Sequence, residues 1–286
     1  MSSQKVLKMI TIAIPTYNRR EAVVNSIEKC ISFPVDFPFK ILVVDNCSDD
    51  GTFNELVSRF SDLNYFRVIR NHQNLGFYGN IIKIFDLVDT EYVIFCSDED
   101  YICSNELDYL QIFLQEYKPF LVSTQVYLQD TDSDLYQGNE VIEKIPYKEV
   151  RVSTNYMSGV VMRVEECKAN AKYLEAHKKN NFVFLYPVPA MSLILAVNGD
   201  SYWYNKVLTR KSFSLKTNIV DISGDDYTSI KARVKQNLGQ LVFLCSIVDV
   251  YGFKKSVKVV GYIVNMVFGL FKSLLRHVLK GFKSFK

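Results

Sequence analysis

Three groups of polar and acidic side chains follow short apolar runs in the first hundred residues. They begin at Pro15, Asp45 and Asp98, and the third group is the triplet Asp98-Glu99-Asp100. Each group alone also fits an ordinary turn. Together they point to chemistry, because carboxylates suit Mg²⁺ or Mn²⁺ and a carboxylate at the end of a strand can accept a hydrogen bond from a nucleobase. The three groups indicate a site for a nucleoside diphosphate and a divalent metal, which would neutralise a diphosphate leaving group.

These groups form one site only if the runs before them are parallel strands that end at the same edge of a sheet. The runs are rich in Ile, Val, Phe and Tyr with little alternation, which is typical of strands buried on both faces. We expect strands at Ile10–Ile14, Lys40–Asp45, Tyr65–Arg70 and Tyr92–Ser97, joined by helices at Arg20–Ile31, Thr52–Phe60 and Tyr78–Val88. The predicted fold class is α/β, with a single doubly wound, mostly parallel sheet flanked by helices.

The order of elements is less regular in the second half. We expect a helix over Asn105–Tyr117 capped by Ser104, a strand over Phe120–Leu128, a polar loop over Gln129–Gly138, a strand over Tyr156–Val164, a helix over Glu165–His177, a short buried helix over Val188–Val197, a strand over Tyr202–Leu208 and one long helix over Asp225–Tyr251. There is no internal repeat and no low-complexity linker. We therefore expect one catalytic domain over residues 1–252 and a C-terminal helical appendage over residues 253–286.

Several function classes are disfavoured by what the sequence lacks. The six cysteines never form a C-x-x-C pair and there are three histidines, so no zinc ligand set emerges. Neither G-x-x-x-x-G-K-[ST] nor G-x-G-x-x-G occurs, which argues against a P-loop NTPase and a dinucleotide dehydrogenase. Of the 34 basic residues, 26 fall in residues 1–253 with all 31 acidic residues, so this part carries a net charge of −5. We expect no nucleic-acid partner, because such binding depends on many basic contacts to phosphate.

Four segments resemble, in order and spacing, the nucleotide-sugar half of family 2 glycosyltransferases of the GT-A fold. They are Ile12–Arg19, Val43–Thr52, Asn74–Asn80 and Asp98–Asp100, and the resemblance covers about residues 9–115, which leaves residues 116–252 as the acceptor half. It implies a surface-polysaccharide type of enzyme and a nucleotide-sugar donor. It also implies nucleotide-sugar ligands at Pro15, Thr16, Tyr17, Asn18, Asp45, Gly76, Asn80 and Asp98, and a Mn²⁺ or Mg²⁺ cofactor on Asp100 with Asp98.

Two glycine-containing motifs have a structural explanation beside the functional one. Gly76 and Asn80 bind the donor on one interpretation, and on the other Gly76 and Gly79 only let the loop pack tightly before a helix. Ser158-Gly159 is similar to the acceptor-side strand of the family and lines the sugar pocket on one interpretation. On the other it is a strand with a glycine for close approach.

The general base is unassigned. The resemblance implies an inverting reaction in which a carboxylate, about ninety residues past the D-x-D motif, deprotonates the acceptor hydroxyl. Here that stretch is Phe184–Ser192, which holds no carboxylate. The next acidic pair, Asp225 and Asp226, is the candidate, although it equally suits the N-terminal cap of the long helix. The alternative is a non-catalytic subunit that binds nucleotide-sugar in a polysaccharide assembly complex. A nucleotidylyltransferase is disfavoured because Pro15–Arg20 is not glycine-rich.

The C-terminal segment differs in charge from the rest of the chain. Residues 254–286 contain eight basic residues and no acidic one, with basic positions at steps of three or four and apolar positions between them. This pattern predicts an amphipathic helix that lies on anionic lipid headgroups; packing on the body or on a partner subunit is the alternative. Residues 1–10 lack the apolar core of a signal peptide. We expect a cytoplasmic protein, peripheral at the inner face of the cell membrane, with a lipid-linked glycan as acceptor.

Overall fold

A computed structural model describes residues 10–32, 39–128, 132–134, 141–150, 154, 156–177, 186–211, 230–248, 257, 259–261 and 263–264. In the first half, strands alternate with helices. The strands are β1 (Ile10–Thr16), β2 (Lys40–Asp45), β3 (Phe66–Arg70) and β4 (Tyr92–Phe95), and the helices are α1 (Arg20–Ile31), α2 (Thr52–Phe60) and α3 (Gly76–Leu87). This confirms the predicted alternation, and α1 and α2 are confirmed at both ends.

The second half is a mixture of short and long elements. In chain order these are β5 (Asp100–Ile102), the 3-10 helix η1 (Ser104–Glu106), α4 (Leu107–Tyr117), β6 (Leu121–Leu128), β7 (Ser133–Asp134), β8 (Ile142–Lys144), the 3-10 helix η2 (Tyr147–Glu149), β9 (Val161–Arg163), α6 (Val164–His177), α7 (Pro187–Asn198), β10 (Ser201–Lys211) and α8 (Ile230–Val248). The predicted α6 and α7 are confirmed within one residue at each end.

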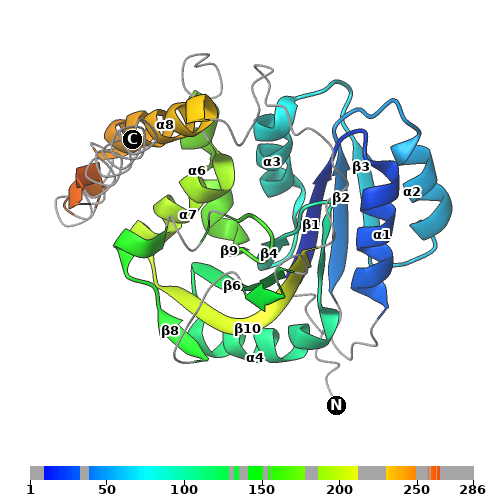
Figure 1. Ribbon diagram of the computed structural model, residues 1–286, viewed down its shortest axis with the longest axis horizontal. Helices are drawn as coiled ribbons and strands as arrows, with labels where there is room; N and C mark the ends of the chain where they lie inside the picture. Colours follow the sequence, from blue (N-terminus) through cyan, green and yellow to red (C-terminus); the bar gives the residue numbers. More distant parts are fainter. Residues whose placement is uncertain are drawn as a thin grey trace, which may run out of the picture.

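The described strands form one sheet in the order β3-β2-β1-β4-β9-β6-β10-β5, with β7 and β8 paired to β6 and β10. Strands β1 to β4 are parallel, β9 is antiparallel to both β4 and β6, and β10 is parallel to β6. Strands β6 and β10 therefore run in the same direction as β1 to β4. The carboxyl ends of β6 and β10 therefore lie at the same edge of the sheet as those of β1 to β4, and the one sheet contains strands from both halves of the chain (Figure 1).

Alternating side chains bury the two faces of the sheet separately. In β1 and β2, Ile12 and Val43 face a core shared with α1, α2 and α4, whereas Ala13 and Leu42 face a core shared with α3, α6 and α7. Successive side chains of a strand point to opposite faces, so apolar residues at every position are expected when helices cover both. Figure 1 shows the two helical layers on either side of the sheet. The α/β fold class with a flanked central sheet is confirmed.

Some predicted details are wrong. Ser104 does not cap α4: it begins η1, makes no capping hydrogen bond, and its buried hydroxyl oxygen has no partner among the described residues. The strand predicted over Tyr156–Val164 is only β9, because residues 156–160 run as a loop along the end of β4. Strands β5, β7 and β8 are additional, and β7 lies within the polar loop predicted over Gln129–Gly138. Asp225 and Asp226 lie outside the described residues, as do the ends of the long helix predicted there.

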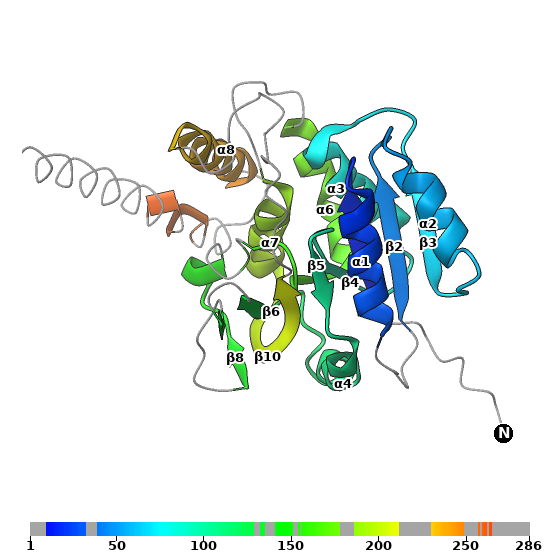
Figure 2. The same cartoon turned by 45° about the vertical axis from the view of Figure 1, so that its right-hand side comes forward.

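The described part of the C-terminal appendage is partly packed on the body. Val259 is buried in the core that contains Phe243 and Ile247 of α8, whereas Val257, Val260 and Val264 are about half exposed. Helix α8 lies at the end of the molecule farthest from α2 and β3 in both views (Figures 1 and 2). Each helix within the described ranges is too short or too polar to cross a bilayer.

Candidate functional site

The first polar group lies where β1 ends and the chain turns into α1. Pro15 and Thr16 are buried as the last residues of the strand, while Tyr17 is 43% exposed. Asn18 has a φ of 51°, in the left-handed region that asparagine enters more readily than most residues. This turn leaves Tyr17 and Asn18 at the surface of the carboxyl edge, where a ligand can reach them.

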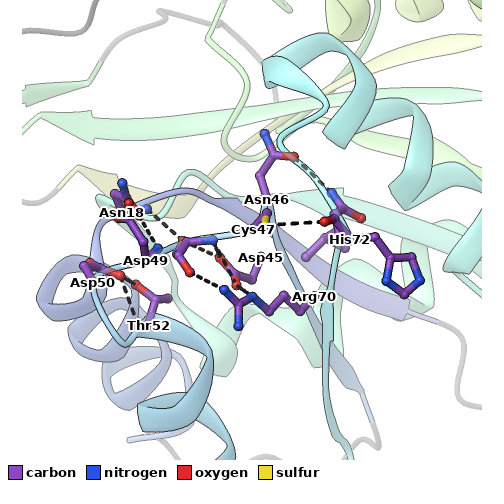
Figure 3. Close-up of polar contacts among 12 residues, drawn as sticks. Asn18, Asp45, Asn46, Cys47, Asp49, Asp50, Thr52, Arg70 and His72 are labelled. Atoms are coloured by element: carbon purple, nitrogen blue, oxygen red, sulfur yellow. Dashed lines mark hydrogen bonds and ion pairs between the residues drawn. The ribbon is translucent and has the colours of Figure 1, made fainter.

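The second group is centred on Asp45, which ends β2 and is fully buried. Its Oδ1 accepts hydrogen bonds from the Ser48 hydroxyl and from the Ser48 N–H at 3.2 Å, and Arg70 Nε lies 3.6 Å from Oδ2. Burial raises the pKa of Asp45, although Ser48 and Arg70 lower it. Ser48 Oγ also accepts from the Asn18 N–H at 2.9 Å. The Asp49 N–H donates to Asn18 Oδ1 at 2.9 Å, and Figure 3 shows Asn18 and Asp49 next to each other at this edge. The first two groups are therefore one connected structure.

The acidic residues that follow have a structural role. Asp50 Oδ1 accepts hydrogen bonds from the N–H and hydroxyl of Thr52, the first residue of α2, and Asp50 Oδ2 accepts from the Arg20 N–H at 3.1 Å. Gly51, which lies between Asp50 and Thr52 in the sequence, has a φ of +85°. The carboxylate therefore fixes the starts of α1 and α2, as a turn leading into a helix requires.

A chain of asparagine side chains holds the loop before α3. Asn46 Nδ2 donates to Asn74 Oδ1 at 2.7 Å, and Asn71 Nδ2 donates to Asn46 Oδ1 at 3.0 Å and to Asn80 Oδ1 at 2.9 Å. Asn80 Nδ2 donates to a carbonyl of β2, and Gly76, with a φ of 69°, donates its N–H to Asn74 Oδ1. These contacts agree with the packing interpretation of the loop. A donor-binding role for Gly76 and Asn80 stays a prediction.

The first acidic residue of the third group is held by contacts on both of its oxygens. Asp98 Oδ2 accepts from the Thr16 hydroxyl at 2.9 Å, and Asp98 Oδ1 accepts from Arg19 Nη1 at 3.0 Å. The same Nη1 contacts Glu99. Burial raises the pKa of Asp98 although Arg19 and Thr16 lower it. Asp98 therefore joins the end of β4 to the end of β1 and brings the three polar groups together, as predicted.

Asp100 has a different environment. Its Oδ2 accepts hydrogen bonds from Ser158 Oγ at 2.6 Å and from the Tyr156 hydroxyl at 2.7 Å. Its Oδ1 is buried and has no partner among the described residues. Burial raises the pKa of Asp100 to about 6, although the two hydroxyls lower it. An unpaired oxygen on a buried carboxylate is costly, and a bound cation would compensate for it.

The carboxylates of this site fit a divalent metal whose coordination is completed by a bound substrate. No group of three or more His, Cys, Asp and Glu side chains in the described part of the chain is arranged to hold a metal ion. Mg²⁺ at phosphate sites is usually held by one or two carboxylates, with water and substrate phosphates supplying the rest. Asp100 offers such a carboxylate, whereas both oxygens of Asp98 have protein partners.

Sequence reasoning missed several side chains of the site. They are Arg19, Ser48, Arg70 and Tyr156, whereas Ser158 was predicted on one interpretation to line the sugar pocket and its contact with Asp100 was not predicted. Arg19 directly follows the first polar group, so its place at the edge was foreseeable, but its pairing with Asp98 depends on the fold. In the predicted acceptor region, Pro187–Ser192 is the buried start of α7 and adds no carboxylate. The predicted base, Asp225 or Asp226, lies outside the described residues.

Solved structures share this fold at low sequence identity. A crystal structure of S. aureus TarS residues 1–349 in complex with UDP-GlcNAc superimposes with a TM-score of 0.68 and 17% identity, covering 91% of this chain and 73% of that one. A second crystal structure of S. aureus TarS residues 1–349 gives a TM-score of 0.64 and 16% identity, covering 91% of this chain and 72% of that one. The fold and the edge of acidic residues thus define a GT-A type of α/β protein.

Sequence comparison identifies the family. The model of the family described as "Glycosyl transferase family 2" matches residues 11–174, which is more than half of the chain and includes all three polar groups. The chain therefore belongs to glycosyl transferase family 2, as its motifs predicted. No curated protein matches it in sequence.

Proposed function

We propose that the protein transfers a sugar from a nucleotide-diphosphate sugar, with the donor bound at the edge formed by the ends of β1, β2 and β4. Asp45 binds the nucleobase, Thr16, Tyr17 and Asn18 line the nucleotide, and Asp98 contacts the nucleotide-sugar. The observation that carries this proposal is the hydrogen-bonded connection of the three polar groups, from Asp45 through Ser48 to Asn18 and from Thr16 to Asp98.

The proposal includes a Mn²⁺ or Mg²⁺ ion held by Asp100. When bound, such an ion would neutralise the diphosphate as it leaves. The support for Asp100 is its buried Oδ1, which has no partner among the described residues. Asp98 is the second ligand predicted from the sequence. Its oxygens contact Thr16 and Arg19, so Asp98 would have to release one of these partners in order to bind the metal.

A uridine nucleotide is the first donor to test. S. aureus TarS has been crystallised with UDP-GlcNAc and with UDP, the latter complex superimposing with a TM-score of 0.54 and 18% identity. Because the sequence identities are only 17% and 18%, the similarity in fold is the sole support for this choice of nucleotide. We propose a UDP-sugar donor on this basis.

The acceptor side of the proposal rests on the sequence. We propose an inverting reaction with Asp225 or Asp226 as general base and a lipid-linked glycan as acceptor. The basic C-terminal segment would hold the enzyme at the anionic inner face of the cell membrane, where such an acceptor lies. The exposure of Val257, Val260 and Val264 supports an apolar contact with lipid.

A panel of UDP, dTDP, GDP and CDP sugars, screened by thermal shift with and without Mn²⁺, tests the donor site. We expect one nucleotide class to stabilise the protein, with a larger effect when Mn²⁺ is present. Release of the free nucleotide from the stabilising donor then tests chemistry. Stabilisation without turnover, on any acceptor or water, would favour the non-catalytic subunit. No stabilisation by any donor would contradict the site itself.

A further inference from the structure

The loop of residues 156–160 belongs to the second half of the chain but lies against the end of β4. Gly159 N–H donates to Phe95 O at 2.9 Å, and Phe95 N–H donates to Val160 O at 3.0 Å. Ser97 N–H donates to Ser158 Oγ at 2.8 Å. These bonds fix the loop beside the acidic triplet, although 58 residues separate Asp100 from Ser158 in the sequence.

This loop contributes two hydroxyls to one oxygen of Asp100. Because Ser158 Oγ already accepts the Ser97 N–H, its own proton is directed to Asp100 Oδ2 at 2.6 Å. The Tyr156 hydroxyl donates to the same Oδ2 at 2.7 Å. Two donors on Oδ2 fix the rotation of the carboxylate, and they leave Oδ1 as the oxygen available to a cation.

Close packing around Gly159 fixes the position of the loop that carries the Tyr156 and Ser158 hydroxyls. Gly159 has a φ of +87°, and a Cβ placed on it would lie 2.5 Å from Thr124 Oγ1 and 2.6 Å from Thr209 Oγ1. The backbone of the loop therefore touches β6 and β10 directly. On the other side, Asp100 is anchored by β5, which pairs with β10, and by the Ser26 hydroxyl, which donates to its carbonyl oxygen.

We infer that Tyr156 and Ser158 are positioning residues that orient Asp100 for the divalent cation. This inference rests on the proposed function, because it takes Asp100 as the metal ligand. Hydrogen-bond partners of metal ligands typically change metal affinity by about 10–100-fold when they are removed. Asp100 is exceptional in the acidic triplet, since Asp98 and Glu99 share the Arg19 guanidinium while Asp100 is oriented by neutral hydroxyls.

The test measures Mn²⁺ affinity by electron paramagnetic resonance in the presence of saturating UDP, for the wild type, Tyr156→Phe and Ser158→Ala. We expect each variant to bind Mn²⁺ about 10–100-fold more weakly, while UDP binding without metal, measured by calorimetry, stays unchanged. Two matched controls lose a buried hydroxyl elsewhere. Tyr92→Phe removes a partner of Arg163 at the amino end of β4, and Ser192→Ala removes a hydroxyl bonded to Val188 O inside α7. Both should keep wild-type Mn²⁺ affinity.

The outcomes separate the inference from the proposed function. If the wild type binds Mn²⁺ and both variants bind it equally well while remaining folded, the inference is overturned and the metal site stands. If the controls weaken Mn²⁺ binding as much as Tyr156→Phe and Ser158→Ala, the effect is general destabilisation and the inference is likewise overturned. If the wild type binds no Mn²⁺ with any nucleotide of the donor panel, the metal assignment itself fails, and the inference fails with it.

Discussion

Replacing Asp100 by asparagine is expected to stabilise the metal-free protein at neutral pH. Burial raises the pKa of Asp100 to about 6 from its ordinary value of 3.8, although Ser158 and Tyr156 donate hydrogen bonds to it. Since the folded pKa is the higher one, the folded protein binds more protons than the unfolded chain between these values. The free energy of unfolding therefore falls as the pH rises through about 4 to 6. The pKa difference of about 2 corresponds to about 3 kcal/mol at neutral pH.

Asparagine removes this cost without disturbing the hydrogen bonds. Its amide oxygen can accept from Ser158 and Tyr156 as Oδ2 does, and its NH₂ group takes the place of Oδ1, which has no partner among the described residues. One unpaired group replaces another, so the gain should approach about 3 kcal/mol. For a domain of this size each kcal/mol shifts the Tm by about 2–4 °C, which gives a rise of several degrees.

The assay is urea unfolding in a chelator at about pH 7.5 and about pH 5, where the gain should fall to about half. Asp50→Asn is the matched control, because the pKa of Asp50 is shifted in the opposite direction. Burial raises this pKa, but the hydrogen bonds from Thr52 and from the Arg20 N–H lower it by more, so the net shift is downward. That substitution should destabilise the protein by nearly the same amount at both pH values, because the stability that comes from a lowered pKa is lost only below the ordinary pKa of 3.8. A loss of stability in Asp100→Asn at neutral pH, or a gain that does not depend on pH, would refute the reasoning.

Three further predictions concern the nucleotide, the loop beside Asp100 and the C-terminal segment. Asp45→Ala should weaken donor binding by about 1–3 kcal/mol, or about 5–150-fold in Kd, whereas Asp50→Ala, which removes only contacts to the starts of α1 and α2, should not; equal affinities by calorimetry would place the nucleobase elsewhere. Gly159→Ala should cost more than about 2 kcal/mol in urea unfolding, because a positive φ is combined with a clash at 2.5 Å, while Gly51→Ala, with the same sign of φ but its nearest contact at 3.6 Å, should cost about 1 kcal/mol. Equal losses would contradict this account of the loop. Replacing Lys272, Arg276, Lys280 and Lys283 by glutamine should abolish sedimentation with anionic vesicles, and wild-type binding should weaken as salt rises; binding that ignores charge and salt would favour packing on a partner.

The first half of the fold could be predicted because its strands are buried on both faces. Within Lys40–Asp45, Ile41–Val44 form a continuous apolar run up to the terminal carboxylate, and this one pattern predicts both the strand and the position of Asp45 at its end. The helices between the strands have regular apolar spacing and clear ends. The predicted edge of polar groups followed from parallel strand order alone.

The second half could not be predicted to the same depth, because its elements depend on tertiary contacts. Strands β5 and β8 are three residues long and carry no periodic signal; they exist because β10 offers them a partner. Residues 156–160 have strand-like composition, yet they form a loop, in which Gly159 has a positive φ and hydrogen bonds to Phe95 hold the backbone against the end of β4. The hydrogen bonds from this loop to Asp100 join residues that are far apart in the sequence, so no local sequence pattern predicts them.

A crystal structure with UDP and Mn²⁺, with anomalous scattering data collected to locate the manganese, tests the central claim most directly. The account predicts a manganese peak beside the Asp100 carboxylate, diphosphate oxygens on the same ion, and the uracil beside Asp45. The described part of the chain also has a pocket at the opposite edge of the sheet, lined by Lys40, Asn64 and Arg67 among others. A nucleotide bound there, or a manganese peak away from Asp100, would contradict the account.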